Sequence, residues 1–205
     1  MGGVSDHPRL PGRIAPADHA DSPAAWPIAS TTSRYDSDFL SVRTDAIVDP
    51  SGEVHERVVV QPRGAVAVLA LDEDSRVLLV EQYRHPVGAR LLELPAGTLD
   101  VDGESALAAA QRELIEEGDV TAADWEEFLA LSATPGYSTE RWQVYRATDL
   151  SPVPHHERAA RHAEGADLEQ WWMPLDAAVQ AIFDGRISNA LAIAAIMTEV
   201  VRRSQ

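Results

Sequence analysis

Four charged side chains, Arg112, Glu113, Glu116 and Glu117, fall within six consecutive positions, RELIEE. On a helix, residues four apart project from the same side, so Glu113 and Glu117 would point together, with Glu116 a little further round. Two carboxylates at this spacing repel each other by roughly a few tenths of a kcal/mol, and a divalent cation removes that repulsion. Ligands that are all oxygen suit Mg²⁺ or Mn²⁺. A solvated acidic face is the alternative interpretation.

The residues around these charges predict a helix over 104–117. Ala, Leu, Glu, Gln and Arg dominate the segment, and Gly118 supplies a stop. The expected packing stripe consists of Leu107, Ala110 and Leu114. The glutamates border small apolar residues, and they follow a predicted Pro-Ala-Gly turn whose carbonyls could supply another ligand. Both features favour a cation site over a solvated face.

Residues 94–120, LPAGTLDVDGESALAAAQRELIEEGDV, resemble the Nudix box. The matching positions are Gly97, Glu104, Arg112, Glu113, Glu116 and Glu117. Six residues, rather than the usual five, separate Gly97 from Glu104. Gly118 stands one place early, so that Asp119 occupies the position of the family's second glycine. The longer spacer precedes the helix and should leave the glutamates in place, whereas the displaced glycine could change how the helix ends.

The resemblance implies a role for each matching residue. It makes Glu113 and Glu117 the main metal ligands, with the carbonyl of Ala96 as a third. It assigns Glu116, Glu104 and Arg112 to the catalytic machinery, where Arg112 would pair with Glu104 or Glu116 and fix the carboxylate geometry. The alternative for Arg112 is an ordinary surface ion pair of little energetic value. The implied cofactor is Mg²⁺, or Mn²⁺ in its place.

The surroundings of the box, over roughly residues 33–200, resemble the branch of ADP-ribose and nucleotide-sugar pyrophosphatases. The similar segments are ERVVVQPRGAVAVLAL, VLLVEQYRHPVGARLLELPAG, TPGYSTE and DGRISNA. The implied reaction is Mg²⁺-dependent hydrolysis of ADP-ribose to AMP and ribose 5-phosphate. Another nucleotide sugar or a dinucleotide, such as GDP-mannose or NADH, is an alternative substrate. A non-catalytic ADP-ribose sensor is disfavoured, because the box carboxylates are present and a basic helix-turn-helix segment is absent.

The same branch implies which residues bind the substrate. Arg84 and Arg57 would contact phosphate or the adenine-ribose end, although either could simply make a strand edge soluble. Glu140 matches a position that contacts substrate across a dimer interface, although a loop glutamate can also be merely solvated. The aromatic rings of Tyr137 and Trp142 could stack on a base or belong to the core.

The general base implied by the resemblance comes from a loop, here HHERAARHAEGADLEQWW. Glu164 sits where the family's glutamate would, and Glu157 is its rival. Long loops in compact domains are often functional. His155, His156 and His162 could suggest zinc, but no fourth-ligand pattern accompanies them, so solvated histidines are the preferred interpretation.

The elements that must position these residues predict an α+β fold, an α/β/α sandwich. Strands and helices alternate irregularly, which favours a mixed sheet flanked by helices. The resemblance implies that this is the Nudix fold, with an N-terminal antiparallel β extension. We expect a flexible tail over residues 1–30, dimerising strands over 31–60 and the hydrolase domain over 61–205. Further helices are expected over 176–185 and 188–203. The second is apolar nearly all round, which suits deep burial or an interface.

The composition of the whole chain narrows the class of partner. The formal charge of −16 argues against a nucleic-acid-binding surface, which needs clustered Lys and Arg. The absence of cysteine excludes disulfides and thiolate nucleophiles and fits a reducing cytoplasm. No run approaches the roughly 20 apolar residues of a membrane span. The composition therefore favours a cytoplasmic protein with neither nucleic acid nor membrane as partner, and the resemblance implies a homodimer that acts on a small nucleoside diphosphate.

Overall fold

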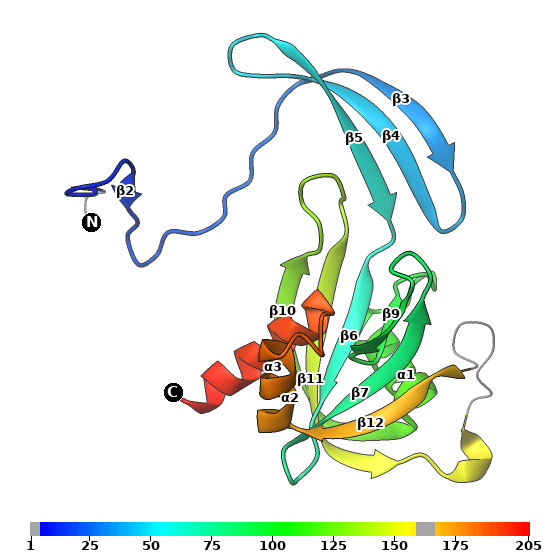
Figure 1. Ribbon diagram of the computed structural model, residues 1–205. Coiled ribbons are helices and arrows are strands. Elements are labelled where there is room, and N and C mark those ends of the chain that lie inside the picture. Colours follow the sequence, from blue (N-terminus) through cyan, green and yellow to red (C-terminus); the bar gives the residue numbers. More distant parts are fainter. Residues whose placement is uncertain (1–4, 159–166) are drawn as a thin grey trace. The chain divides into compact units, whose positions relative to one another are not determined.

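The computed structural model describes residues 5–158 and 167–205, and the chain forms two compact units (Figure 1). One unit consists of Met1–Thr32 with Thr44–Arg57, and the other of Ser33–Arg43 with Val58–Gln205. In the described part of the chain, no helix is both long and apolar enough to cross a membrane.

The N-terminal strands begin with a short antiparallel pair, β1 (Ser5–Asp6) and β2 (Arg13–Ile14), inside the expected tail. A three-stranded sheet in the order β3-β4-β5 follows. Its strands are β3 (Ile28–Asp36), β4 (Leu40–Val48) and β5 (Val54–Pro62). All nine residues of β3 are exposed. The role of residues 31–60 in dimerisation stays a prediction.

Two sheets form the centre of the second unit. The four-stranded sheet has the order β10-β11-β6-β9, and the three-stranded sheet has the order β12-β7-β8. Their bounds are β6 (Ala65–Ala70), β7 (Arg76–Arg84), β8 (Ala89–Glu93), β9 (Ala96–Thr98), β10 (Val120–Ser132), β11 (Arg141–Pro152) and β12 (Glu169–Pro174). Because β11 pairs with β6 in parallel and its other pairs are antiparallel, the four-stranded sheet is mixed, as expected, whereas the three-stranded sheet is antiparallel throughout.

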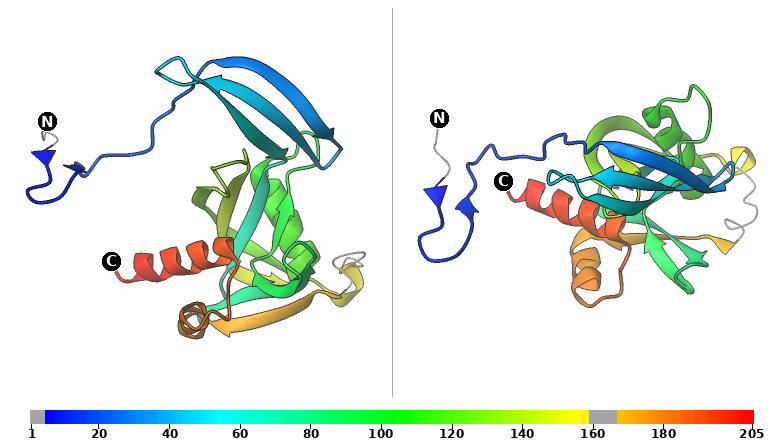
Figure 2. Two further views of the ribbon diagram at one scale, coloured as in Figure 1. Left: turned by 45° about the horizontal axis from the view of Figure 1, so that its top comes forward. Right: turned by 90° about the horizontal axis from the view of Figure 1, so that it is seen from above.

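In the described part of the chain, three helices flank these sheets: α1 (Ala106–Gly118), α2 (Leu175–Phe183) and α3 (Ala190–Arg203), together with a short 3₁₀ turn, η1 (His155–Glu157). Val66, Val68 and Leu78 pack in one apolar cluster with α1, whereas Leu69 and Leu79 pack in another with α2 and α3. Alternate residues of β6 and β7 thus face opposite helical layers, because strand side chains alternate. Figure 2 shows α1 on one side of the sheets and α2 and α3 on the other. The predicted α/β/α sandwich is confirmed.

The box helix α1 is capped at both ends. The Ser105 hydroxyl accepts a hydrogen bond from the Ala108 N–H at 3.2 Å. At the other end Asp119 adopts the left-handed conformation with φ of 55°. The expected packing stripe is wrong at its start, because Leu107 is exposed and burial begins at Ala109 and Ala110. The expected Pro-Ala-Gly turn is also displaced, since its last two residues open strand β9.

The C-terminal helix α3 buries one face in the core through Leu191, Ala192, Ala195 and Ile196. The same face carries Glu199, whose side chain is fully buried. Arg146, Arg202 and Arg203 surround its carboxylate at 3.3, 3.0 and 2.7 Å. Of the two expectations for this apolar helix, burial in the core is therefore observed.

Candidate functional site

The carboxylate of Glu113 lies directly above the backbone of Gly97 in β9. A Cβ atom added to Gly97 would overlap the Glu113 side chain, so only glycine leaves room for this close approach. Glu113 is only 8% exposed, which is unusual for a carboxylate. Strand β9 thus fixes where this glutamate can lie.

The carboxylate of Glu117 is held by the neighbouring residue of the same strand. Its Oε2 atom accepts a hydrogen bond from the Ala96 N–H at 2.8 Å. The N–H groups of Val68 and Leu99 pair with the Pro95 and Gly64 carbonyls, so the pair Ala67–Ala96 between them is not hydrogen-bonded within the ladder. The N–H and C=O groups of Ala96 therefore face away from β6. Its carbonyl lies on the edge of β9 from which the N–H reaches Glu117.

The guanidinium of Arg112 joins the carboxylates of the box. It donates to both oxygens of Glu104, at 3.1 and 3.0 Å, and to Glu113 Oε1. The contact with Glu116 is longer, at 3.5 Å. Arg112 thus pairs mainly with Glu104, which lowers the pKa of that carboxyl group. The second partner, Glu113, is one of the two α1 glutamates that contact β9.

Burial changes the titration of the two glutamates that contact β9. Desolvation raises the pKa of Glu117 to about 7, and the hydrogen bond from Ala96 opposes this only in part. Desolvation likewise raises the pKa of Glu113 against the opposing charge of Arg112. Two partly desolvated carboxylates and an outward-facing carbonyl form a donor set of hard oxygens, which fits Mg²⁺ or Mn²⁺.

A cavity of about 430 Å³ is lined in part by Ala96 and Gly97, the two β9 residues that contact Glu117 and Glu113. Ala96, Gly97 and Thr98 of β9 line one side of it. Two residues expected to bind substrate, Arg84 and Glu140, also line it. The guanidinium of Arg84 is held by Glu93, with Nη2 2.7 Å from Oε2.

A family model described as NUDIX domain matches residues 61–195. The chain belongs to the Nudix family. The proposed membership is thereby confirmed, and with it the assignment of the chain to a family of hydrolases.

Two curated relatives and one solved structure extend this result. The ADP-ribose pyrophosphatase of Mycobacterium tuberculosis is 40% identical over 159 residues, 78% of this chain and 75% of the relative. A methanol dehydrogenase activator from Bacillus methanolicus is 32% identical over 157 residues, 77% of this chain and 83% of the relative. The crystal structure of an ADP compounds hydrolase has a TM-score of 0.75 at 24% identity, over 90% of this chain and 96% of that chain, which shows the same fold.

The Nudix box ends differently here from the family pattern, and the structure gives the reason. Gly118 is the last residue of α1, where a Cβ atom would lie 2.9 Å from Leu78 Cδ2. Asp119, in the glycine's usual position, takes the left-handed conformation itself and donates its N–H to the Ile115 carbonyl at 3.2 Å. Asp is one of the few residues other than glycine that enter this region readily. The displaced glycine therefore serves packing, and the turn survives without it.

Several residues of the cavity were missed by the sequence reasoning. Glu93 is buried, and it receives the Gln82 amide at 3.4 Å as well as Arg84. Asn189 caps α3 by accepting the Ala192 N–H at 2.9 Å and also lines the cavity. A glutamate at the end of an apolar strand was the available signal for Glu93, because burial of such a charge requires a partner.

The remaining predicted residues lie outside this cluster or outside the described residues. Arg57 belongs to the other unit, where its side chain donates to the Glu56 carbonyl at 2.9 Å. Tyr137 is 56% exposed, whereas Trp142 lines the cavity. Glu157 is exposed and lies 3.2 Å from His156. Glu164 and His162 lie outside the described residues, and His155 is exposed in η1.

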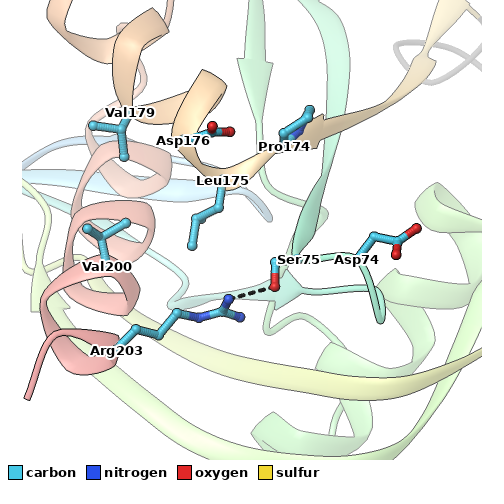
Figure 3. Close-up of a pocket in the computed structure, with 8 residues that line it drawn as sticks. All are labelled: Asp74, Ser75, Pro174, Leu175, Asp176, Val179, Val200 and Arg203. Carbon is cyan, nitrogen blue, oxygen red and sulfur yellow. Dashed lines mark hydrogen bonds between the residues drawn. The ribbon is translucent and has the colours of Figure 1, made fainter.

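A larger cavity of about 570 Å³ lies between α2, α3 and the turn before β7 (Figure 3). Leu175, Val179 and Val200 give it an apolar lining, and Arg203 reaches Ser75 Oγ at 2.7 Å across its floor. None of the predicted site residues lines it.

Within residues 5–158 and 167–205, one group of three potential metal ligands comes together, in the first compact unit: Asp49, Glu53 and His55. The Asp49 carboxylate already accepts hydrogen bonds from the Ser51 N–H and hydroxyl, the Glu53 N–H and His55 Nε2. These bonds stabilise the turn between β4 and β5 and lower the pKa of Asp49. We assign this group to the turn.

Proposed function

We propose that this Nudix protein hydrolyses the pyrophosphate bond of ADP-ribose and releases AMP and ribose 5-phosphate. The observation that carries the proposal is the double role of β9. Ala96 and Gly97 line the 430 Å³ cavity, and the same two residues contact Glu117 and Glu113. A substrate in the cavity would therefore present its pyrophosphate to the carboxylates. The relationship to a protein named ADP-ribose pyrophosphatase supports this substrate.

The residues that would hold the metal are Glu113, Glu117 and the carbonyl of Ala96, with Glu116 nearby. Bound there, Mg²⁺ or Mn²⁺ would neutralise pyrophosphate charge and acidify the attacking water. Arg112 keeps Glu113 in place through their direct contact and is itself fixed by both oxygens of Glu104. The pairing limits the rotamers available to Glu113 before any ligand arrives.

The cavity residues supply binding and orientation. Arg84 offers a planar fork suited to phosphate, and Glu93 holds that fork in one orientation through its buried carboxylate. Trp142 presents an aromatic ring to the cavity, on which the adenine would stack. Glu140 lies in the same wall and would accept from substrate hydroxyl or amino groups.

The test is the Glu117→Gln variant assayed against ADP-ribose, GDP-mannose and NADH with Mg²⁺, with products identified. We expect the wild type to prefer ADP-ribose and form AMP, and Glu117→Gln to lose at least about 1,000-fold in kcat, as losses of groups that act directly on the transition state do. Glu73→Gln, at an exposed glutamate in the turn before β7, is the matched control and should retain full activity. A wild type that leaves ADP-ribose intact would refute the substrate, and an active Glu117→Gln variant would refute the metal assignment.

We propose Glu164 as the general base, with Glu157 as the rival. Both belong to the charged segment of the sequence between β11 and β12. Replacing the true base with Gln should remove the acidic limb of the pH–rate profile and lower kcat by about 100- to 10,000-fold. The glutamate whose replacement leaves both quantities unchanged is excluded as the base.

We propose that residues 31–60 form the interface of a homodimer. Exposed strand edges readily pair with a second chain, and every residue of β3 is exposed. Sedimentation velocity at micromolar concentration should give a dimer for the full chain. A monomer under these conditions would refute the proposal.

A further inference from the structure

Asp119 carries a carboxylate where the family pattern has a glycine, and that carboxylate is buried. The backbone at this position needs a φ of 55° and an N–H bonded to the Ile115 carbonyl. A glycine, which has no side chain, would meet both requirements. Yet Asp119 is only 8% exposed, so its charged side chain bears a desolvation cost that the turn itself does not demand. The side chain must therefore be explained by what it contacts.

The first partner of the Asp119 side chain is Gln170 in β12. The Gln170 Nε2 atom donates to Asp119 Oδ2 at 3.1 Å and to the backbone carbonyl of Glu117 at 2.7 Å. One amide thus bridges the carboxylate of Asp119 and the last turn of the helix that presents Glu117. Because Gln170 pairs with Val80 in the sheet, this bridge ties the turn to the three-stranded sheet.

The second connection runs to the end of β11. The Val153 N–H donates to the Asp119 carbonyl at 2.8 Å, and Arg158 Nε donates to the Val153 carbonyl at 3.2 Å. The same Nε lies 3.9 Å from Asp119 Oδ1. The carboxylate therefore faces a cation from the chain after β11 and an amide donor from β12.

We propose that Asp119 is a positioning residue for the metal ligand Glu117. Its carboxylate orients the Gln170 amide, and that amide fixes the carbonyl of Glu117 and with it the direction of the last helical turn. The proposal rests on the proposed function for the role of Glu117. It differs from simple helix capping, which needs only the backbone of residue 119 and would be served equally by glycine.

The experiment compares Asp119→Gly with wild type, because glycine keeps the left-handed turn and removes only the carboxylate. Mn²⁺ binding, measured by electron paramagnetic resonance without nucleotide, should weaken at least about fivefold. With ADP-ribose and Mg²⁺, kcat should fall at least about tenfold while KM stays within about threefold, since the binding cavity is unchanged. The melting temperature should stay close to that of wild type.

The chain offers a matched control and an independent check. Asp149 is an exposed aspartate with the same φ of 55°, so Asp149→Gly removes a carboxylate from the same backbone conformation and should leave Mn²⁺ binding and kcat unchanged. Gln170→Leu should reproduce the Asp119→Gly defect, and the double variant should be no worse than either single one.

Asp119→Gly that binds Mn²⁺ and turns over as wild type does would overturn the proposal, as would losses that add in the double variant. If the wild type proved inactive on ADP-ribose, the Mn²⁺ measurements would still decide the role of Asp119, so the two failures are distinguishable.

Discussion

Two opposing influences act on the pKa of the Glu117 carboxyl group. Burial raises its pKa to about 7, whereas the Ala96 N–H and the charge of Arg84 favour the ionised form. A metal ion binds the ionised form, so a proton and the metal compete for this side chain. Burial thus brings the titration of the proposed metal ligand into the neutral range.

The pH dependence of metal affinity follows from this competition. Because the pKa of Glu117 is raised, the group is protonated below about pH 7, and Mn²⁺ affinity should fall by about tenfold per pH unit below that value. Titrating Mn²⁺ into the protein between pH 5.5 and 8 checks the prediction. An affinity that stays constant from pH 7 to pH 5.5 would contradict it.

The absence of a side chain at Gly97 leaves room for the Glu113 carboxylate. In Gly97→Ala the added methyl group would overlap the Glu113 carboxylate, and the strand or the glutamate must move. We expect a loss of at least about 100-fold in kcat, since misplacing a reacting group by about 1 Å has effects of that order. The control is Gly136→Ala, where open space surrounds the added Cβ atom, and activity there should be retained. Equal activity of the two variants would argue against a fixed position for Glu113.

At the level of elements, the box helix was the most predictable part of the chain. Its composition and the stop at Gly118 placed the helix within two residues of its observed bounds. The buried face was predicted less well, because helical periodicity gives the direction of Leu107 but not whether another element covers it. No strand was predicted over residues 120–127 of β10, since five of these eight residues are exposed and only four are apolar.

The hydroxyl of Ser105 caps the N-terminus of α1. Ser105→Ala removes the acceptor for the Ala108 N–H and should lower the free energy of unfolding by about 1 kcal/mol. Because the cap lies two turns from Glu113, Mn²⁺ affinity should change less than about twofold. Urea unfolding measures the first quantity. Unchanged stability would show that water replaces the cap.

The sequence predicted which residues of the box would serve as metal ligands, but not the hydrogen bonds that join the site to residues on other elements. The spacing of Glu113 and Glu117 was readable because both lie on one helix. The contact of Glu93 with Arg84 joins residues nine apart on two strands, and the role of Asp119 depends on Gln170, 51 positions later. Contacts between distant positions depend on the fold, and a local pattern does not contain them.

In the second compact unit as a whole, the buried Glu199 connects α3 with the four-stranded sheet. Arg146 comes from β11, while Arg202 also reaches Glu126 of β10 at 3.3 Å. Burial pushes the pKa of Glu199 upward, but hydrogen bonds from Arg202 and Arg203 and the charge of Arg146 outweigh it, so that the pKa is lowered. The carboxylate is thus stabilised in its charged form by elements far apart in the sequence.

Glu199→Gln should destabilise the protein by about 3 kcal/mol, because it leaves the arginines without their buried counter-charge. The folded pKa is lowered, so this contribution is present at neutral pH and is lost as pH falls below the ordinary carboxyl value. Urea unfolding at pH 7 and pH 3.5 should therefore show a smaller difference at the lower pH. Glu126→Gln, at an exposed partner of the same arginines, should cost less than about 1 kcal/mol.

Because Trp142 lines the cavity, its fluorescence should report whether a nucleotide is bound there. A purine stacked on that indole would quench its share of the protein's fluorescence, to which five tryptophans contribute. In a Glu117→Gln background, where the nucleotide stays intact, the quenching would follow ligand binding in real time without any chemical label.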